Sequence, residues 1–360
     1  MMILPTLRKM IQRLTSGTRE FVVFFLGDTE LVYVHVSPAE EGLHVLDHGT
    51  QEIPDGVLIQ GVIMNEHDFQ KILERLNERL KVKNVHVLLP DSVAYRFSVY
   101  IPISEEMPSR QTIEIELRDH LHRTTGRVYK DLICEYEIVA SDQYGLDIDA
   151  FVLSAEIVQQ VTKVFRLAQM RVLTIETQGK SVAVTGTQNS VQLVIDMDVD
   201  TVTVTVAAGT HIVKRHPIQV GYRHLVGAVK GCLGVTDERA QEIFDTFGLY
   251  GTHKDPALLS RLEFTLEPLL FMVQKVLADW YGKEYRHATQ QSPIERIMLT
   301  GRHGNTPGLD HYLVRTVRMP VDHFDLQDYV VGDIPAISES YSHQYAPLIL
   351  RAKEIAEKGE

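Results

Sequence analysis

Three short segments rich in glycine, aspartate and threonine carry the residues of this chain that could bind a flat or anionic ligand. Each follows an apolar stretch, where a glycine lets the backbone approach a ligand because no Cβ intervenes. Backbone N–H groups in such turns suit phosphate oxygens, whereas a carboxylate needs a cation to screen it. A single glycine turn is more typical of an ordinary strand end, so the interpretation depends on the whole set. The candidates are Gly27, Asp28, Thr29, Asp196, Asp198, Gly221, Thr300, Gly301, Arg302 and Gly304.

Two predicted β-hairpins and a later strand would position these segments. Residues 21–26 are apolar, and the alternation that follows at 31–36 is typical of a second strand. The second half of the chain repeats this order, because the apolar run 191–195 leads to strict alternation at 202–206 and then to a further strand. The third segment follows a short apolar strand at 297–299. Corresponding hairpins therefore open the two halves of the chain.

This order resembles the actin-like superfamily, in which two phosphate-binding hairpins and an adenosine loop close around ATP between two lobes. Within it, the chain resembles the branch of the pilus assembly protein PilM and the cell-division protein FtsA. The resemblance extends along nearly the whole chain and includes the helix start at 233–240, the strand at 319–321 and the closing segment at 345–351. It implies an α/β, two-lobed actin-like (RNase H-like) fold, with a small strand-helix-strand subdomain inserted in the first lobe.

The resemblance and the hydrophobic periodicity together predict the division into domains. An amphipathic N-terminal segment, in which either a membrane surface or the protein's own lobe would cover the apolar face, precedes the lobes. The predicted parts are 1–18 for this segment, 19–90 and 151–188 for the first lobe, 91–150 for the inserted subdomain, 189–221 and 294–345 for the second lobe, 222–293 for its helical part, and 346–360 for a C-terminal helix.

Several positions depart from the family pattern, and all of them fall where the family binds its nucleotide. Phenylalanine cannot replace an aspartate that holds a metal-bound water, nor a lysine that reaches the nucleotide. The departures are Phe25 for the first aspartate, Asp198 for a glycine, Tyr222 for a glycine, Phe244 for the lysine, and Arg302 with His303 inside the glycine loop. We therefore expect weak or no binding of ATP and Mg²⁺, and no hydrolysis. The alternative is that Arg302 and His303 supply new phosphate or adenine contacts.

Composition narrows the classes of function. The formal net charge of −12 argues against nucleic acid as a partner. Only two cysteines are present, which favours a reducing compartment over a disulfide framework. No run approaches the roughly 20 apolar residues of a membrane-spanning helix. The sequence contains no paired Cys-x-x-Cys motif, P-loop lysine or nucleophile elbow. Neither a bound metal nor a catalytic residue is predicted.

The resemblance implies a cytoplasmic adaptor, peripheral to the inner membrane, in the type IV pilus assembly platform. Such an adaptor would dock the N-terminal peptide of a PilN-like membrane protein as an added strand, since open sheet edges bind extended peptides. Other pilus components are further implied partners, and self-association is left open. The alternatives are an FtsA-like cytoskeletal tether, a GspL-like type II secretion scaffold and an active actin-like ATPase. The candidate residues of the peptide groove are Tyr95, Phe97, Val99 and Ile101.

Overall fold

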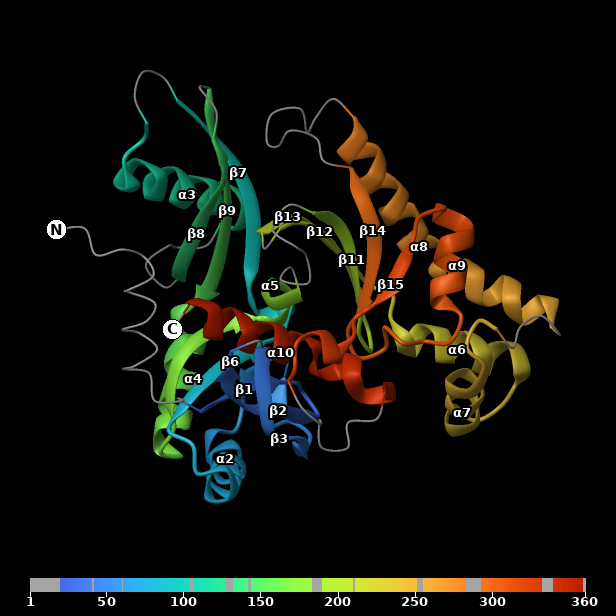
Figure 1. Ribbon diagram of the computed structural model, residues 1–360, viewed down its shortest axis with the longest axis horizontal. Helices are drawn as coiled ribbons and strands as arrows, with labels where there is room; N and C mark the ends of the chain where they lie inside the picture. Colours follow the sequence, from blue (N-terminus) through green and yellow to red (C-terminus); the bar gives the residue numbers. More distant parts are fainter. Residues whose placement is uncertain are drawn as a thin grey trace.

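Two lobes, each built on a five-stranded sheet, and a smaller three-stranded sheet make up the fold (Figure 1). The computed structural model describes residues 20–40, 42–59, 61–103, 107–126, 132–141, 144–182, 190–209, 211–250, 255–282, 293–331 and 339–358. The amphipathic segment expected at 1–18 lies outside these ranges. No helix within them is both long and apolar enough to span a membrane.

The sheet of the first lobe contains the first predicted hairpin. β1 and β2 pair antiparallel, β3 continues the meander, and β6 and β10 add in parallel on the other side of β1. The order is β10-β6-β1-β2-β3. A short ribbon of β4 and β5 lies outside this sheet. The strands are β1 (Phe21–Leu26), β2 (Glu30–Ala39), β3 (Gly42–Glu52), β4 (Leu58–Ile59), β5 (Val62–Ile63), β6 (Asn84–Leu89) and β10 (Arg171–Thr177).

Two amphipathic helices, α2 (Glu66–Leu80) and α4 (Ala155–Leu167), contribute their apolar faces to the core of this lobe. Phe165 of α4 packs against Phe24 of β1, with ring centroids 5.5 Å apart. The helical face predicted from the spacing of apolar residues in α2 is buried as expected. The short helices η1 (Asp91–Val93) and α5 (Gln178–Val182) directly follow β6 and β10.

The inserted subdomain is a three-stranded antiparallel sheet with one helix on it. Its core joins alternate residues of the sheet to the buried face of α3. The expected strand-helix-strand order is incomplete, because a third strand forms the centre of the sheet and extends beyond the predicted boundary at residue 150. Apolar residues and aspartates alternate in the first half of that strand. The elements are β7 (Tyr95–Pro102), α3 (Arg110–Thr125), β8 (Leu132–Ser141) and β9 (Gly145–Ser154), in the sheet order β7-β9-β8.

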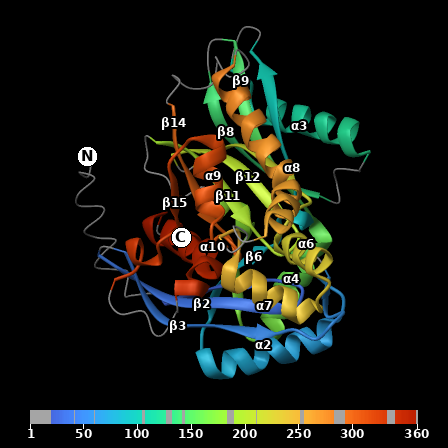
Figure 2. The ribbon, with the colours of Figure 1, turned by 90° about the vertical axis from the view of Figure 1, so that its right-hand side faces the viewer.

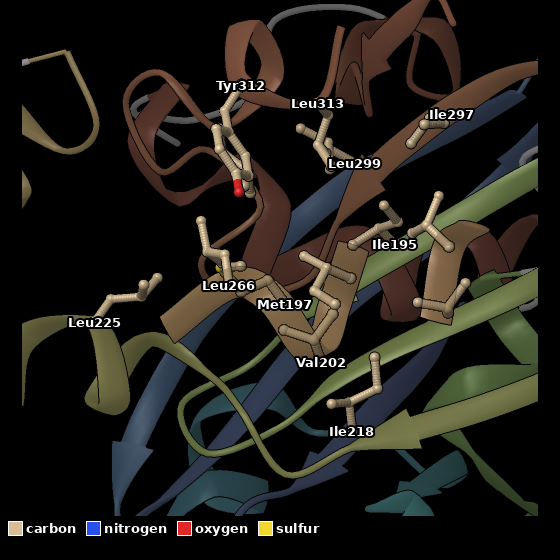
Figure 3. Close-up of a cluster of buried hydrophobic side chains, with 14 of the residues drawn as sticks. Ile195, Met197, Val202, Ile218, Leu225, Leu266, Ile297, Leu299, Tyr312 and Leu313 are labelled. Carbon is tan, nitrogen blue, oxygen red and sulfur yellow. The ribbon is translucent and has the colours of Figure 1, made fainter. Parts of the chain in front are cut away.

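The second lobe repeats the strand arrangement, with the order β13-β12-β11-β14-β15. Four helices enclose its core, and Figure 3 shows side chains from the sheet meeting Leu225, Leu266 and Tyr312 from three of these helices. The strands are β11 (Val191–Met197), β12 (Val202–Ala208), β13 (His211–Ile218), β14 (Ile294–Thr300) and β15 (Val321–His323). The helices are α6 (Tyr222–Leu233), α7 (Asp237–Phe247), α8 (Pro256–Tyr281) and α9 (Leu309–Val317).

The C-terminal helix α10 (Glu339–Lys358) joins the two lobes and begins before the predicted boundary at 346. Its buried residues share one core cluster with β1 and β2 of the first lobe and with β11 and β14 of the second. The short helix η6 (Leu326–Asp328) contributes to the same cluster. α10 also carries Arg351, which is almost fully buried and pairs with Glu176 and Glu354.

Candidate functional site at the interlobe junction

The junction consists of the ends of the β1–β2 and β11–β12 hairpins, the loop 301–304, η1, α5 and Arg215. In the first hairpin, Gly27 donates its N–H to the carbonyl of Glu30 at 3.0 Å. Asp28 accepts from the N–H of Gly61 at 3.1 Å, and the carbonyl of Thr29 accepts from Ile53. Three candidates, Gly27, Asp28 and Thr29, therefore form contacts within their own lobe.

The second hairpin is tied to the first turn of α6. Tyr222 and Arg223 donate their backbone N–H groups to the carbonyls of Asp198 and Val199, at 3.1 and 2.9 Å. These are donors at a helix N-terminus, the kind that elsewhere bind phosphate. The N-cap residue Gly221 donates to Nδ1 of His224 at 3.1 Å. The backbone N–H groups at the start of α6 are thus hydrogen-bonded within their own lobe.

Gly221 packs directly on the backbone of the second hairpin. A Cβ at this position would lie 2.6 Å from Thr201 N and 2.7 Å from Asp198 O, distances that real Cβ atoms do not show. We expect Gly221→Ala to destabilise the protein by roughly 2 kcal/mol, because the hairpin must shift. Thermal unfolding measures the loss. The control is Gly227→Ala in the same helix, where nothing lies within 4 Å of the added Cβ. Helix propensity predicts a gain of up to ~1 kcal/mol there, and equal losses at both positions would contradict this packing.

The loop after β14 folds back onto the end of β11. His303 donates its N–H to the carbonyl of Met197 at 2.9 Å, and Gly304 donates to Gly301 at 3.0 Å. Gly301 adopts φ +87°, and a Cβ there would meet the carboxylate of Asp196. Thr300 is fully buried and pairs with Asp196 across β11 and β14. The structure therefore brings together Asp196, Asp198, Gly221, Thr300, Gly301 and Gly304.

Aromatic side chains fill the space between this loop and α6. The ring of Tyr222 stacks on that of His303, with centroids 3.7 Å apart and planes within 10°. Phe244 of α7 lies against Tyr222 at 5.6 Å and is almost fully buried. The hydroxyl of Tyr222 donates to Asp245 at 2.5 Å. Burial and the nearby guanidinium of Arg302 lower the pKa of His303 to about 4, so this ring is neutral near pH 7.

Within the described ranges, two ion pairs cross the junction between the lobes. Arg302, in the loop after β14, pairs with Glu30 at the start of β2. Arg215 of β13 pairs with Asp91 of η1. The carboxylate of Asp91 also accepts the N–H of Gly179 in α5 at 3.2 Å. Burial raises the pKa of Asp91, but the pairing with Arg215 and the hydrogen bonds lower it more, so that the net shift is downward.

Carboxylates gather around Arg215. Burial lowers the pKa of this arginine, but the charges of Asp91, Asp196 and Asp149 raise it more, so that the net shift is upward. The side chain of Gln178 in α5 hydrogen-bonds to Asp198. Burial raises the pKa of Asp198. Asp196 is buried more deeply. Its burial, which has the largest effect, and the charges of Asp198 and Asp91 raise its pKa to about 7. Its Oδ2 atom has no hydrogen-bond partner among the described residues. The junction is therefore acidic around one arginine.

The peptide-groove candidates lie on β7, which is an edge strand of the subdomain sheet. Phe97 and Ile101 are 8% and 4% exposed, because they pack in the core under α3. Val99 is half-buried against the same core, and Tyr95 is 37% exposed. The side chains of Phe97 and Ile101 are thus unavailable to line a groove, and Tyr95 is the candidate that remains accessible.

Sequence reasoning missed the residues that connect the lobes. The candidates did not include Glu30, Asp91, Gln178 and Arg215. Each of these four residues nevertheless contacts a candidate residue or acts electrostatically on one. Asp91 follows an apolar strand, as the candidates do, and this signal could have found it. Arg215 has no such signal, since its partner lies 124 residues away.

Comparison with known proteins gives matches only among solved structures. No protein-family model matches the sequence, and no curated protein does. A PilM–PilN type IV pilus biogenesis complex contains a chain with 16% identity, 94% of this chain and 98% of that chain covered, and a TM-score of 0.72. MreB5 of Spiroplasma citri bound to ADP gives 11% identity, 95% and 99% coverage, and a TM-score of 0.55.

The fold is actin-like. The ethanolamine utilization protein EutJ from Carboxydothermus hydrogenoformans is a further neighbour, with 12% identity, 93% and 89% coverage, and a TM-score of 0.53. These similarities confirm the predicted two-lobed actin-like architecture and the resemblance in fold to PilM.

Proposed function

We propose that this chain is an adaptor of the type IV pilus assembly platform, held at the cytoplasmic side of the inner membrane through its partners. In this role it docks the N-terminal peptide of a PilN-like membrane protein, binds ATP weakly or not at all, and does not hydrolyse it. The observation that carries the proposal is the similarity to the PilM–PilN complex over 94% of the chain, with a TM-score of 0.72 against 0.53 and 0.55 for the two other neighbours.

The geometry of the interlobe junction supports weak or absent nucleotide binding. The N–H groups of Tyr222, Arg223 and His303, which could face a phosphate or a base, donate to protein carbonyls instead. The stacked rings of Tyr222 and His303 fill the adenine side of the junction. Asp196 and Asp198 place two carboxyl groups on the second hairpin, and Arg215, whose charge acts on Asp196, is paired with Asp91, so these carboxylates would repel phosphate. The residues present therefore do not fit ATP with Mg²⁺.

The edge strand β7 supports peptide docking. Among the described residues it pairs with β9 alone, so its other side presents backbone N–H and C=O groups that an extended peptide can pair with. Main-chain hydrogen bonds give such a complex its affinity, and neighbouring side chains give it specificity. Tyr95 is the accessible aromatic residue at the start of this strand. The opposite edge, β8, carries the exposed Ile138 and supplies a matched control.

The experiment compares Tyr95→Glu with Ile138→Glu. The probe is a fluorescent peptide of the cytoplasmic N-terminal segment of the same organism's PilN-like protein, and anisotropy measures its binding. We expect Tyr95→Glu to weaken binding at least tenfold, since a new charge would be desolvated at the contact. Ile138→Glu should leave binding within twofold. Loss of binding in the Ile138 variant alone would contradict docking at β7.

A further inference from the structure

One face of α8 is exposed along almost the whole helix, on the outside of the second lobe (Figure 2). Its positions alternate in steps of four and three residues, the spacing of a helix–helix contact stripe. Phe264 and Phe271 on this stripe are 62% and 66% exposed, whereas the opposite face is buried in the core. The exposed stripe consists of Ala257, Arg261, Phe264, Pro268, Phe271, Lys275 and Ala278.

Charges lie symmetrically about Phe264. Arg261 precedes it by three residues, and Glu267, at the side of the stripe, follows it by three. Arg261 lies over the Phe264 ring at 6.0 Å, and no ion pair is found for Arg261 or Glu267 within the described part of the chain. Nearby Glu263, in contrast, pairs with Arg315 of α9 at 2.6 Å. Among the described residues, this part of α8 therefore offers one cation and one anion that form no ion pair, each three residues from an exposed aromatic ring.

We propose that α8 docks antiparallel against α8 of a second copy of this chain, with the two-fold axis passing beside Phe264. This operation places Phe264 against Phe264 of the second copy, and an isologous interface makes every other contact twice. Arg261 then faces Glu267 of the second copy. Phe271 packs over Ala257 of the second copy, where a small side chain leaves room for the ring.

The charged residues favour this position of the two-fold axis over other positions along α8. A two-fold axis near the middle of α8 would set Glu267 against Glu267 of the second copy, and like charges in contact are unfavourable. An axis at Phe264 replaces that repulsion with two Arg–Glu pairs. Ala257 and Pro268, the other stripe residues within this contact, add no bulk that would hold the helices apart.

The exposed area indicates a weak, concentration-dependent dimer. A phenylalanine side chain buries ~150 to 250 Å² when fully covered. With 62% and 66% exposure, the four phenylalanines of two copies offer on the order of 500 Å². A specific interface needs roughly 1,000 Å² in total, so the surrounding residues must contribute about half. We therefore expect dissociation constants in the micromolar range.

Analytical ultracentrifugation of the full chain over a series of concentrations tests the proposal. Arg261→Glu and Glu267→Arg should each weaken dimerisation about tenfold or more, because two attractive contacts become repulsive. The double variant should restore it, since the charges then pair in the reverse sense. Arg110→Glu, on an exposed position of α3, is the control and should change nothing. A chain that stays monomeric at all concentrations, or a dimer that neither single reversal weakens, would overturn the proposal.

Cysteine cross-linking tests the register independently. In a background of Cys134→Ser and Cys232→Ser, Phe264→Cys should form an oxidised dimer, because the axis brings this position next to itself. Phe271→Cys should not, because the two copies of residue 271 would lie about 21 Å apart along the helices at ~1.5 Å per residue. Efficient cross-linking through residue 271 but not 264 would overturn the register.

Discussion

Replacing Arg351 by methionine is expected to destabilise the protein by about 3 to 5 kcal/mol, the largest loss predicted for a single polar side chain here. Arg351 is 1% exposed. Its guanidinium pairs with Glu354 at 2.8 Å and with Glu176 at 3.3 Å, and it donates to the hydroxyl of Thr174 at 3.2 Å. Methionine keeps the volume but leaves two largely buried carboxylates without this cation. Chemical denaturation followed by circular dichroism measures the loss.

A matched control separates burial from pairing. Arg315 and Glu263 form a similar ion pair at 2.6 Å, but their side chains are 56% and 37% exposed. Arg315→Met should therefore cost less than ~1 kcal/mol. In the Arg351 variant, adding Glu354→Leu should recover part of the loss, because one of the isolated carboxylates is removed. Equal losses for Arg315 and Arg351 would contradict the role of burial.

Replacing Asp196 by asparagine is expected to stabilise the protein at pH 8 by as much as roughly 4 kcal/mol. The carboxyl has an ordinary pKa of 3.8, which burial and the charges of Asp198 and Asp91 raise to about 7. Above pH 7 the folded state must hold it ionised, which is unfavourable. Asparagine has the same shape without the charge, and its amide can donate to neighbouring carboxylate oxygens.

The pH dependence gives the sign of this effect. An acid with a raised pKa binds its proton more strongly in the folded state, so its unfavourable contribution is absent below the unfolded pKa, 3.8, and grows as pH rises to about 7. The difference in the free energy of unfolding between Asp196→Asn and the natural chain should be near zero at pH 4. It should reach a plateau above pH 7. A difference that does not change between pH 4 and pH 8 would contradict an ionised buried Asp196.

The sequence predicted the two hairpins of the fold because apolar and polar residues alternate in their strands, within a few residues of the turns. The same reasoning placed Asp196, Gly221 and Gly301 together, since each directly follows or faces a strand end. The third strand of the subdomain was missed although Leu146, Asp147 and Ile148 begin an alternation of apolar and polar residues that is typical of a strand. Asp149 acts on the charge of Arg215 in the other lobe. That aspartate thus serves a contact that only the tertiary structure reveals.

Pattern reasoning also treated Phe244 and Tyr222 as substitutions at a ligand. In the structure Tyr222 stacks on His303 and Phe244 packs at an angle against Tyr222, so both rings contribute to the packing of the second lobe. Likewise, alternation in β7 identified Phe97 and Ile101 as a common face but could not tell a groove from a core. Which element covers a face depends on contacts between distant segments, in this case α3.

Calorimetric titration of the full chain with the N-terminal peptide of its PilN-like protein, with and without millimolar ATP and Mg²⁺, tests most directly whether this actin-like protein binds a peptide in preference to a nucleotide. We predict saturable peptide binding that ATP leaves unchanged, and no heat from ATP alone, since losing several charge-assisted contacts of ~1.5 to 3 kcal/mol each takes a micromolar nucleotide to millimolar or weaker affinity. Micromolar binding of ATP together with no binding of the peptide would contradict the proposed adaptor function.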